Sequence, residues 1–159
     1  MFFALLRPRA PRSTAARQSN GIWSLAWSGD NREIIAGTAD QSLYVYDVAA
    51  GRTVVTAVAG ADDVNAVAYA DESSQMIFTG CDDHEVKVWD RRLLGAGGPT
   101  GGGAVGVFLG HNEGITHLDS KGDGRYLISN SKDQSIKASR GGRCCCCCCW
   151  LEVPHAVAA

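Results

Sequence analysis

The sequence lacks the features that would mark a membrane protein or a nucleic-acid-binding protein. No apolar run approaches the roughly 18 residues that a membrane-spanning helix needs. Acidic residues are absent from positions 1–29, whose four arginines carry +4, so the rest of the chain carries −6 of the net charge of −2. Binding to a phosphate backbone requires a basic face, which this acidic body does not supply. We therefore expect a soluble protein whose partner is neither a membrane nor a nucleic acid.

Cysteine is almost absent from the patterned part of the chain, which contains only Cys81. The other six cysteines are consecutive, in a run that begins at Cys144 and ends at Cys149. Adjacent cysteines cannot reproduce the paired spacing of a structural zinc site, and His155 is the one further ligand nearby. We therefore expect no metal and no other cofactor, and we interpret residues 140–159 as a low-complexity Cys-rich or mistranslated tail. Metal binding or lipidation of these thiols is the alternative.

Residues 1–20 contain Arg, Ala and Ser but no acid, which is the composition of an organelle transit peptide. Pro8 and Pro11 would interrupt the amphipathic helix that such a peptide forms. We expect an unstructured start, with organelle import as the minor alternative.

The most informative feature present is a repeat. Residues 34–47 recur 43 positions later as residues 77–90, and a third copy at 127–137 then loses the pattern. Each copy alternates apolar and polar residues over short runs that end in turn residues, which predicts four strands in about 40 residues. Strand 22–27 has apolar residues on both faces, so we expect both faces to be buried. Units of this kind bury their faces only against neighbouring units.

The sequence thus predicts an all-β fold of about three four-stranded blades, a partial β-propeller. The three units span about 21–58, 60–109 and 110–139, and the third is incomplete because its alternation stops after Lys137. A Gly-rich loop at 94–104 lengthens the second unit without disturbing its pattern.

Three features recur in register and resemble the WD40 repeat family: the pair Gly110-His111, Asp83 and Asp133 at the turns, and the pair Trp89-Asp90. The resemblance implies a buried hydrogen-bond relay of His, Ser or Thr, Asp and Trp in each blade. The candidates are His111, Ser129 or Ser131 and Asp133 in the third unit, Thr79, Asp83 and Trp89 in the second, and Thr38, Asp40 and Tyr46 in the first. No unit is complete, since Ala61 replaces the His of the second unit and Ser139 replaces the Trp of the third.

A His-Asp-Ser set also invites a hydrolase interpretation. Neither serine lies in a G-x-S-x-G context, however, and the repeat accounts for every member of the set. We therefore expect no catalytic residue, and the chain is not predicted to be an enzyme.

Within the family, residues 77–92 resemble the box by which some propellers dock onto the damaged-DNA-binding adaptor of cullin-4 ubiquitin ligases. The matching residues are Ile77, Phe78, Thr79, Gly80, Asp83, Trp89, Asp90 and Arg92, and Cys81 is a departure. The first unit has Tyr46 and Ala49 at the Trp and Arg positions, and the third has Ser139. Asp83, Trp89, Asp90, Arg91 and Arg92 are therefore the predicted partner-binding residues.

The sequence segments around this box resemble one subfamily, the eleventh of the cullin-4-associated factors in its plant form. That resemblance implies a ubiquitin-ligase substrate receptor in the nucleus or cytosol, with an unknown protein substrate. Three alternatives stay open: a general assembly scaffold with a solvated Arg92, a thiol or metal protein built on the cysteine run, and a truncated product without function.

Overall fold

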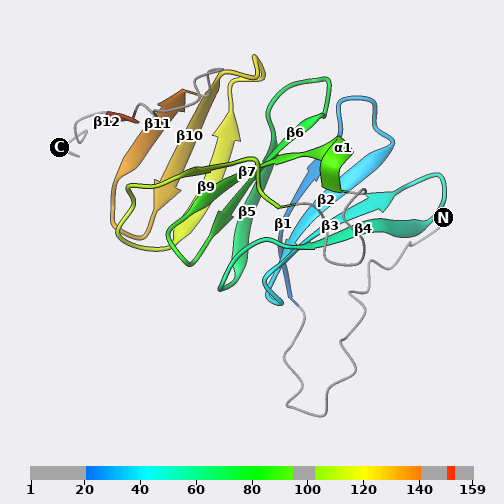
Figure 1. Ribbon diagram of the computed structural model, residues 1–159, viewed down its shortest axis with the longest axis horizontal. Helices are drawn as coiled ribbons and strands as arrows, with labels where there is room; N and C mark the ends of the chain where they lie inside the picture. The colour runs from blue at the N-terminus through cyan, green and yellow to red at the C-terminus, as the bar shows by residue number, and fades with distance from the viewer. Residues whose placement is uncertain (1–20, 95–102, 141–149, 153–159) are drawn as a thin grey trace, which may run out of the picture.

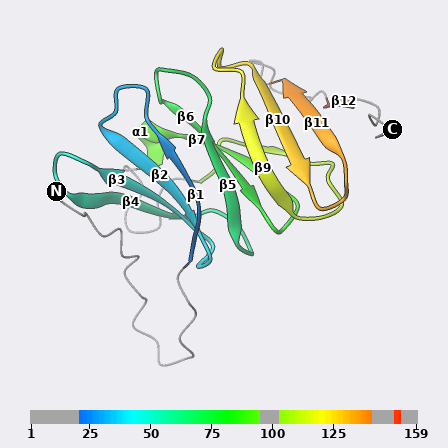
Figure 2. The ribbon, with the colours of Figure 1, turned by 180° about the vertical axis from the view of Figure 1, so that it is seen from behind.

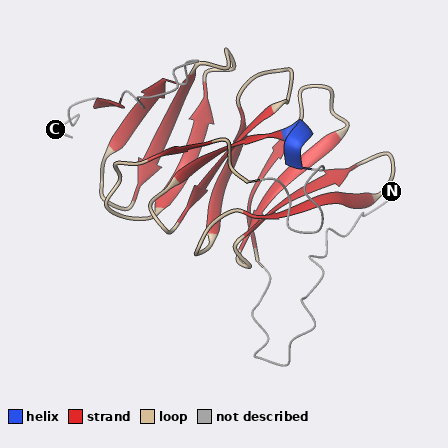
Figure 3. Cartoon of the chain, in the orientation of Figure 1, coloured by secondary structure: helices blue, strands red, loops and turns tan. Residues whose placement is uncertain are grey.

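The computed structural model describes residues 21–94, 103–140 and 150–152, and these are built almost entirely from β-strands (Figure 3). The strands form three four-stranded antiparallel sheets. In each sheet, neighbouring strands follow one another in the chain, and the sheets lie side by side in chain order (Figures 1 and 2). We call the sheets blades 1, 2 and 3. The arrangement confirms the predicted all-β class and the partial propeller.

Blade 1 contains β1 (Ile22–Trp27), β2 (Glu33–Thr38), β3 (Ser42–Asp47) and β4 (Arg52–Val58). Blade 2 contains β5 (Val64–Tyr69), β6 (Met76–Cys81), β7 (Val86–Asp90) and β8 (Gly106–Phe108), with a helical turn α1 (Arg91–Leu94) directly after β7. Blade 3 contains β9 (Ile115–Ser120), β10 (Tyr126–Ser131), β11 (Ile136–Arg140) and β12 (Trp150–Glu152).

The hairpin between the second and third strands of each blade turns at an equivalent place. Gln41, His84 and Gln134 have φ values of 65°, 71° and 63°, in the left-handed region, and each follows an aspartate. In blades 2 and 3 that aspartate accepts a hydrogen bond from the backbone two residues on, because Asp83 is bonded by the amide of Glu85 and Asp133 by the amide of Ser135. Local Asp-to-backbone bonding of this kind favours a tight turn.

The core lies between the blades. Ile35, Leu43 and Val45 of blade 1 belong to one buried cluster with Val67 and Ile77 of blade 2. A second cluster joins blade 2 to blade 3, and its members are Ala66, Ala70, Phe78, Val86, Val88, Phe108, Ile115, Leu118 and Leu127. The sheets approach so closely that a Cβ on Gly37 would lie 2.6 Å from the carbonyl oxygen of Val64. Glycine at this position is therefore a packing requirement.

The expectation that β1 is buried on both faces is wrong. Trp23, Leu25 and Trp27 are 56%, 58% and 56% exposed. The opposite face of β1 does contact blade 2, where Ser24 Oγ accepts the amide of Val67 at 3.2 Å. A strand with apolar residues on both faces is buried on both only when a sheet packs on each face. Within the described residues, no sheet covers the outer face of β1.

Nothing in the sequence pattern predicts β12. This three-residue strand comes from the segment interpreted as a tail, and it pairs antiparallel with β11 through Ser139 and Trp150. Strand pairing uses the backbone, so the exposed edge of β11 can accept a partner with little demand on sequence. Residues 1–20, the glycines of the loop up to position 102 and all six cysteines of the run lie outside the described residues.

Candidate functional site

The predicted docking box forms the β6–β7 hairpin of blade 2 and the turn that follows. Ile77 and Phe78 point to opposite faces of β6 and are 0% and 6% exposed, packed against blade 1 and blade 3 respectively. The indole Nε1 of buried Trp89 donates to Thr79 Oγ1 at 2.9 Å. This bond ties β7 to β6 and satisfies a polar group that has no access to water.

Asp83 lies at the turn of this hairpin, where its carboxylate accepts the amides of Ala61 (2.9 Å) and Glu85 (3.2 Å) and lies 3.3 Å from Lys87 Nζ. Burial alone would raise the pKa of Asp83, but these bonds and the Lys87 charge outweigh it and lower the pKa. The whole of strand β7 lies between Asp83 and Arg92 in the chain. The structure therefore places Asp83 and Arg92 at opposite ends of the hairpin. Asp83 stabilises the turn through the amide of Glu85 and the preceding loop through the amide of Ala61.

Asp90 and Arg92 form a hydrogen-bonded ion pair at the other end. The carboxylate of Asp90 accepts Nη2 at 2.7 Å, Nε at 3.0 Å and the backbone amide of Arg92 at 2.9 Å. The side-chain bond from Arg92 is the largest of the effects that lower the pKa of Asp90 to about 2. The Arg92 side chain is nevertheless 73% exposed. A two-point contact thus fixes the orientation of a guanidinium that remains open to solvent.

Arg91 has a different environment. Its Nε and Nη2 donate to the two carboxylate oxygens of Glu33 on β2, at 2.9 and 2.6 Å. The Arg91 side chain is 21% exposed and that of Glu33 24%. The hydrogen bond to Glu33 is the main cause that raises the pKa of Arg91. Arg91 is one of the predicted partner-binding residues, and in the structure it joins blade 1 to blade 2.

The relay of blade 3 contains His111, Ser129 and Asp133. His111 Nδ1 lies 2.9 Å from Asp133 Oδ2, and its Nε2 lies 2.8 Å from Ser129 Oγ. Burial would raise the pKa of Asp133, but hydrogen bonds from Ser135 and His111 outweigh it and lower that pKa strongly. Of the two predicted serines, Ser129 contacts the imidazole, while Ser131 Oγ donates to the carbonyl of Glu113 at 2.8 Å.

The relay of blade 1 is built from different residues. Thr38 Oγ1 donates to Asp40 Oδ1, and the Tyr44 hydroxyl donates to Asp40 Oδ2 at 2.6 Å. Burial, then the bond to Asp40, raises the pKa of Tyr44. Alignment with Trp89 predicts Tyr46 as the member of this set. In the structure, the hydroxyl that donates to Asp40 is that of Tyr44. Two further residues carry no motif in the sequence: Glu33, whose partner Arg91 is 58 positions away, and Ser135, whose hydroxyl donates to Asp133 within the same turn.

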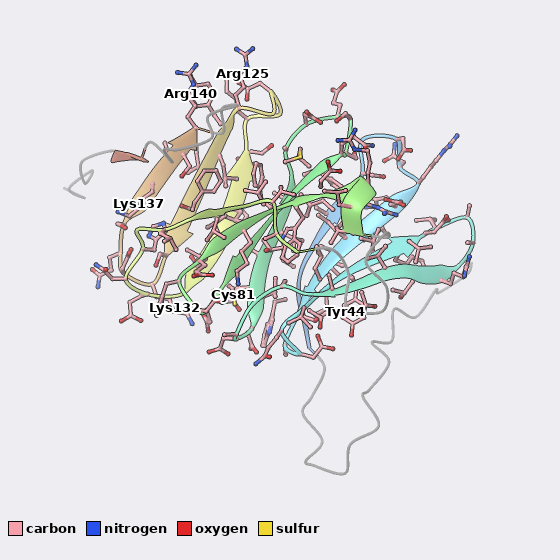
Figure 4. All side chains as sticks on the ribbon, viewed as in Figure 1. Tyr44, Cys81, Arg125, Lys132, Lys137 and Arg140 are labelled. Atoms are coloured by element: carbon pink, nitrogen blue, oxygen red, sulfur yellow. The ribbon has the colours of Figure 1, made fainter. Side chains whose placement is uncertain are left out.

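Among the described residues, no group of three His, Cys, Asp or Glu side chains is placed to hold a metal ion. Cys81 Sγ donates to the carbonyl of Asp62 at 3.1 Å, and burial raises the pKa of the Cys81 thiol to about 11. In Figure 4 Cys81 and Lys132 lie at one end of the sheets, and Arg125 and Arg140 project from the other. No described helix is long and apolar enough to cross a membrane.

Comparisons with known proteins agree with this geometry. Residues 11–47, 52–90 and 102–138 match the family described as "WD domain, G-beta repeat". The chain is 51% identical over 119 residues to the LEC14B protein of Lithospermum erythrorhizon, covering 75% of this chain and 24% of that protein. It is 44% identical over 122 residues to the DDB1- and CUL4-associated factor 11 homolog of Caenorhabditis elegans, covering 76% of this chain and 21% of that one.

The chain therefore spans about a quarter of the length of these relatives. Among solved structures, the WD40 repeats of RRP9 superpose with a TM-score of 0.66 at 18% identity, over 79% of this chain and 37% of that one. This likeness concerns the fold alone. With three matched repeats, three blades and these relatives, the chain belongs to the WD40 repeat family.

Proposed function

We propose that the chain is a protein-interaction module of a cullin-4 RING ubiquitin ligase, where it serves as substrate receptor and docks onto the DDB1-type adaptor through blade 2. The observation that carries the proposal is the Asp90–Arg92 pair, which presents a fixed and exposed guanidinium directly after the Trp89-Asp90 motif. The name of the Caenorhabditis elegans relative, DDB1- and CUL4-associated factor 11 homolog, supports it.

The chemistry of the contact follows from the geometry of Arg92. Asp90 engages Nε and Nη2, so the Nη1 side of the planar group points away from this pair and can donate to a carboxylate or backbone carbonyl of the adaptor. Leu93, the next residue on α1, is 49% exposed and offers an apolar contact beside the charge. Trp89, Thr79 and Asp83 shape the hairpin, and we assign them no direct contact.

The proposal predicts that Arg92→Ala weakens binding of the purified adaptor by about 10- to 100-fold. Hydrogen bonds to charged groups contribute about 1.5–3 kcal/mol, and a buried interface would leave the adaptor's acceptor unpaired. Titration calorimetry or a quantitative pull-down against the adaptor measures the change. Arg92→Lys, which keeps the charge but loses the planar fork, should recover only part of the affinity.

Arg125→Ala is the matched control, because Arg125 is an exposed arginine of blade 3. It should leave adaptor binding unchanged, and both variants should keep the unfolding temperature of the parent chain. If Arg92→Ala binds the adaptor as tightly as the parent, the docking proposal fails and the assembly-scaffold function becomes the better account.

We infer that the module has no chemistry of its own, because Ser129 and His111 are only 1% and 6% exposed, so a substrate could not reach the hydroxyl inside the blade. Recognition of a protein substrate then falls to exposed loops, where such folds keep variable contacts. A ligase receptor of this kind would act in the nucleus or cytosol, and the substrate is unknown.

A further inference from the structure

The helical turn α1 is attached to blade 1 as well as to the blade that it follows. At its start, the Arg91 guanidinium donates to both carboxylate oxygens of Glu33 on β2, and the Arg91 amide donates to the carbonyl of Gln75 in blade 2 at 2.7 Å. At its end, Leu94 is 2% exposed and belongs to the buried cluster that contains Ile35 of blade 1. In Figures 1 and 2, α1 lies beside β2. The first and last residues of the turn are therefore held between the two blades.

The two residues between these anchors point outward. The Arg92 side chain is 73% exposed, and Leu93 is 49% exposed. Residues three positions apart lie on the same side of a helical turn, so Arg91 and Leu94 can both face the blades while the middle pair faces solvent. The guanidinium assigned to adaptor docking thus stands on a turn whose opposite side is attached to blade 1.

The contact between Asp90 and Arg92 does not by itself orient α1, because its bonds lie within three consecutive residues. The orientation of the turn relative to the blades depends on contacts with distant parts of the chain, and Glu33 lies 58 positions from Arg91. Both side chains of this pair are mostly buried, so solvent screens their attraction little. A planar guanidinium held at two points also has little freedom to rotate.

We propose that Glu33 is a positioning residue for adaptor docking: by holding Arg91 it fixes α1, and α1 presents Arg92 and Leu93. The inference rests on the proposed docking role of Arg92. Glu33 makes no contact with the adaptor and acts only through Arg91. A turn that is already held loses less conformational entropy on binding, which strengthens the complex. Recognition by blade 2 therefore depends on a side chain of blade 1.

The inference predicts that Glu33→Ala weakens adaptor binding by about 3- to 10-fold, since the released turn must be ordered when the adaptor binds. Titration calorimetry of the full 159-residue chain against the purified adaptor measures the change. The exchanged pair, Glu33→Arg with Arg91→Glu, keeps the net charge and restores an ion pair, so it should recover most of the affinity. Without adaptor, the amides of Arg91 and Arg92 should exchange hydrogen faster in Glu33→Ala than in the parent, as NMR can measure.

Thr38→Val is the matched control. Thr38 lies at the opposite end of β2 from Glu33, and its buried hydroxyl donates to Asp40. The change should destabilise blade 1 by removing a buried hydrogen bond, without altering the contacts of α1. Thr38→Val should therefore lower the unfolding temperature but leave both the adaptor affinity and the exchange of the Arg91 amide as in the parent.

The outcomes separate this inference from the docking proposal. If Arg92→Ala weakens binding but Glu33→Ala does not, the positioning role of Glu33 is wrong and the docking proposal stands. If Thr38→Val weakens binding as much as Glu33→Ala, the cause is a general loosening of blade 1, and the positioning role is again wrong. Tighter binding by Glu33→Ala would show that Arg91 contacts the adaptor directly. If Arg92→Ala has no effect, the docking proposal is wrong, and the inference is wrong with it.

Discussion

At the residue scale, two adjacent arginines have different partners because the backbone changes between them. β7 ends at Asp90, and the helical turn α1 begins at Arg91. Successive side chains on a helix diverge by about 100°. Arg91 therefore points toward Glu33 of blade 1, while Arg92 points back to Asp90 and to solvent. The same dipeptide thus supplies one guanidinium that joins two blades and one that is exposed to solvent.

Thr79→Val should destabilise the chain by about 1–3 kcal/mol. Valine has the shape of threonine but leaves the buried indole N–H of Trp89 without its acceptor. Urea unfolding followed by tryptophan fluorescence measures the change. Thr56→Val on the exposed side of β4 is the control and should stay within about 0.5 kcal/mol. A loss for Thr79→Val no larger than that of the control would contradict the assigned bond.

Asp133→Asn should reduce stability most near neutral pH. The pKa of Asp133 is lowered from 3.8 in the folded chain, so its ionised form contributes stability that is present above pH 3.8 and is lost as the pH falls toward the folded pKa. The difference in unfolding temperature between parent and variant should be constant from pH 7 to about pH 5 and shrink below about pH 3.8. A difference that does not change with pH would contradict a role for the charge.

At the element scale, each blade is specified by local patterning, but its attachment to the next blade depends on contacts that cross between sheets. The turn aspartates and the apolar alternation recur within each unit, and they predicted the four-stranded units that the structure shows. Glu33 and Arg91 lie 58 positions apart and carry no shared motif. Their pairing follows from the packing of β2 beside the end of β7, which the sequence alone does not reveal.

The Arg91–Glu33 contact predicts a measurable coupling between blades 1 and 2. In a double-mutant cycle of Arg91→Ala and Glu33→Ala, the coupling energy should be about 1 kcal/mol, since both side chains are mostly but not fully buried. Guanidinium salts screen ion pairs, so urea is the suitable denaturant. The pair Lys121 and Asp123 of blade 3 is more exposed and should show a smaller coupling. Additive single effects at Arg91 and Glu33 would contradict the link.

At the scale of the whole molecule, the described residues leave apolar side chains exposed on the outer faces of blades 1 and 3. Leu25 and Trp27 on blade 1 and Ile128 and Ile136 on blade 3 are exposed at positions that the repeat elsewhere buries. Each blade has one face that packs on the preceding blade and one that packs on the next. A run of blades therefore leaves one face uncovered at each end.

The sequence by itself determined the fold class, the strand pattern and the WD40 resemblance, because alternation, turn residues and the Trp89-Asp90 motif are local and repeat in register. Only the tertiary structure decided that Arg91 is committed to Glu33 while Arg92 stays open, that Tyr44 and not Tyr46 holds Asp40, and that the outer face of β1 is exposed. Each of these depends on which strand or blade lies next to a residue in space. A side chain's role is set by that neighbour, and a local pattern specifies only which face the side chain is on.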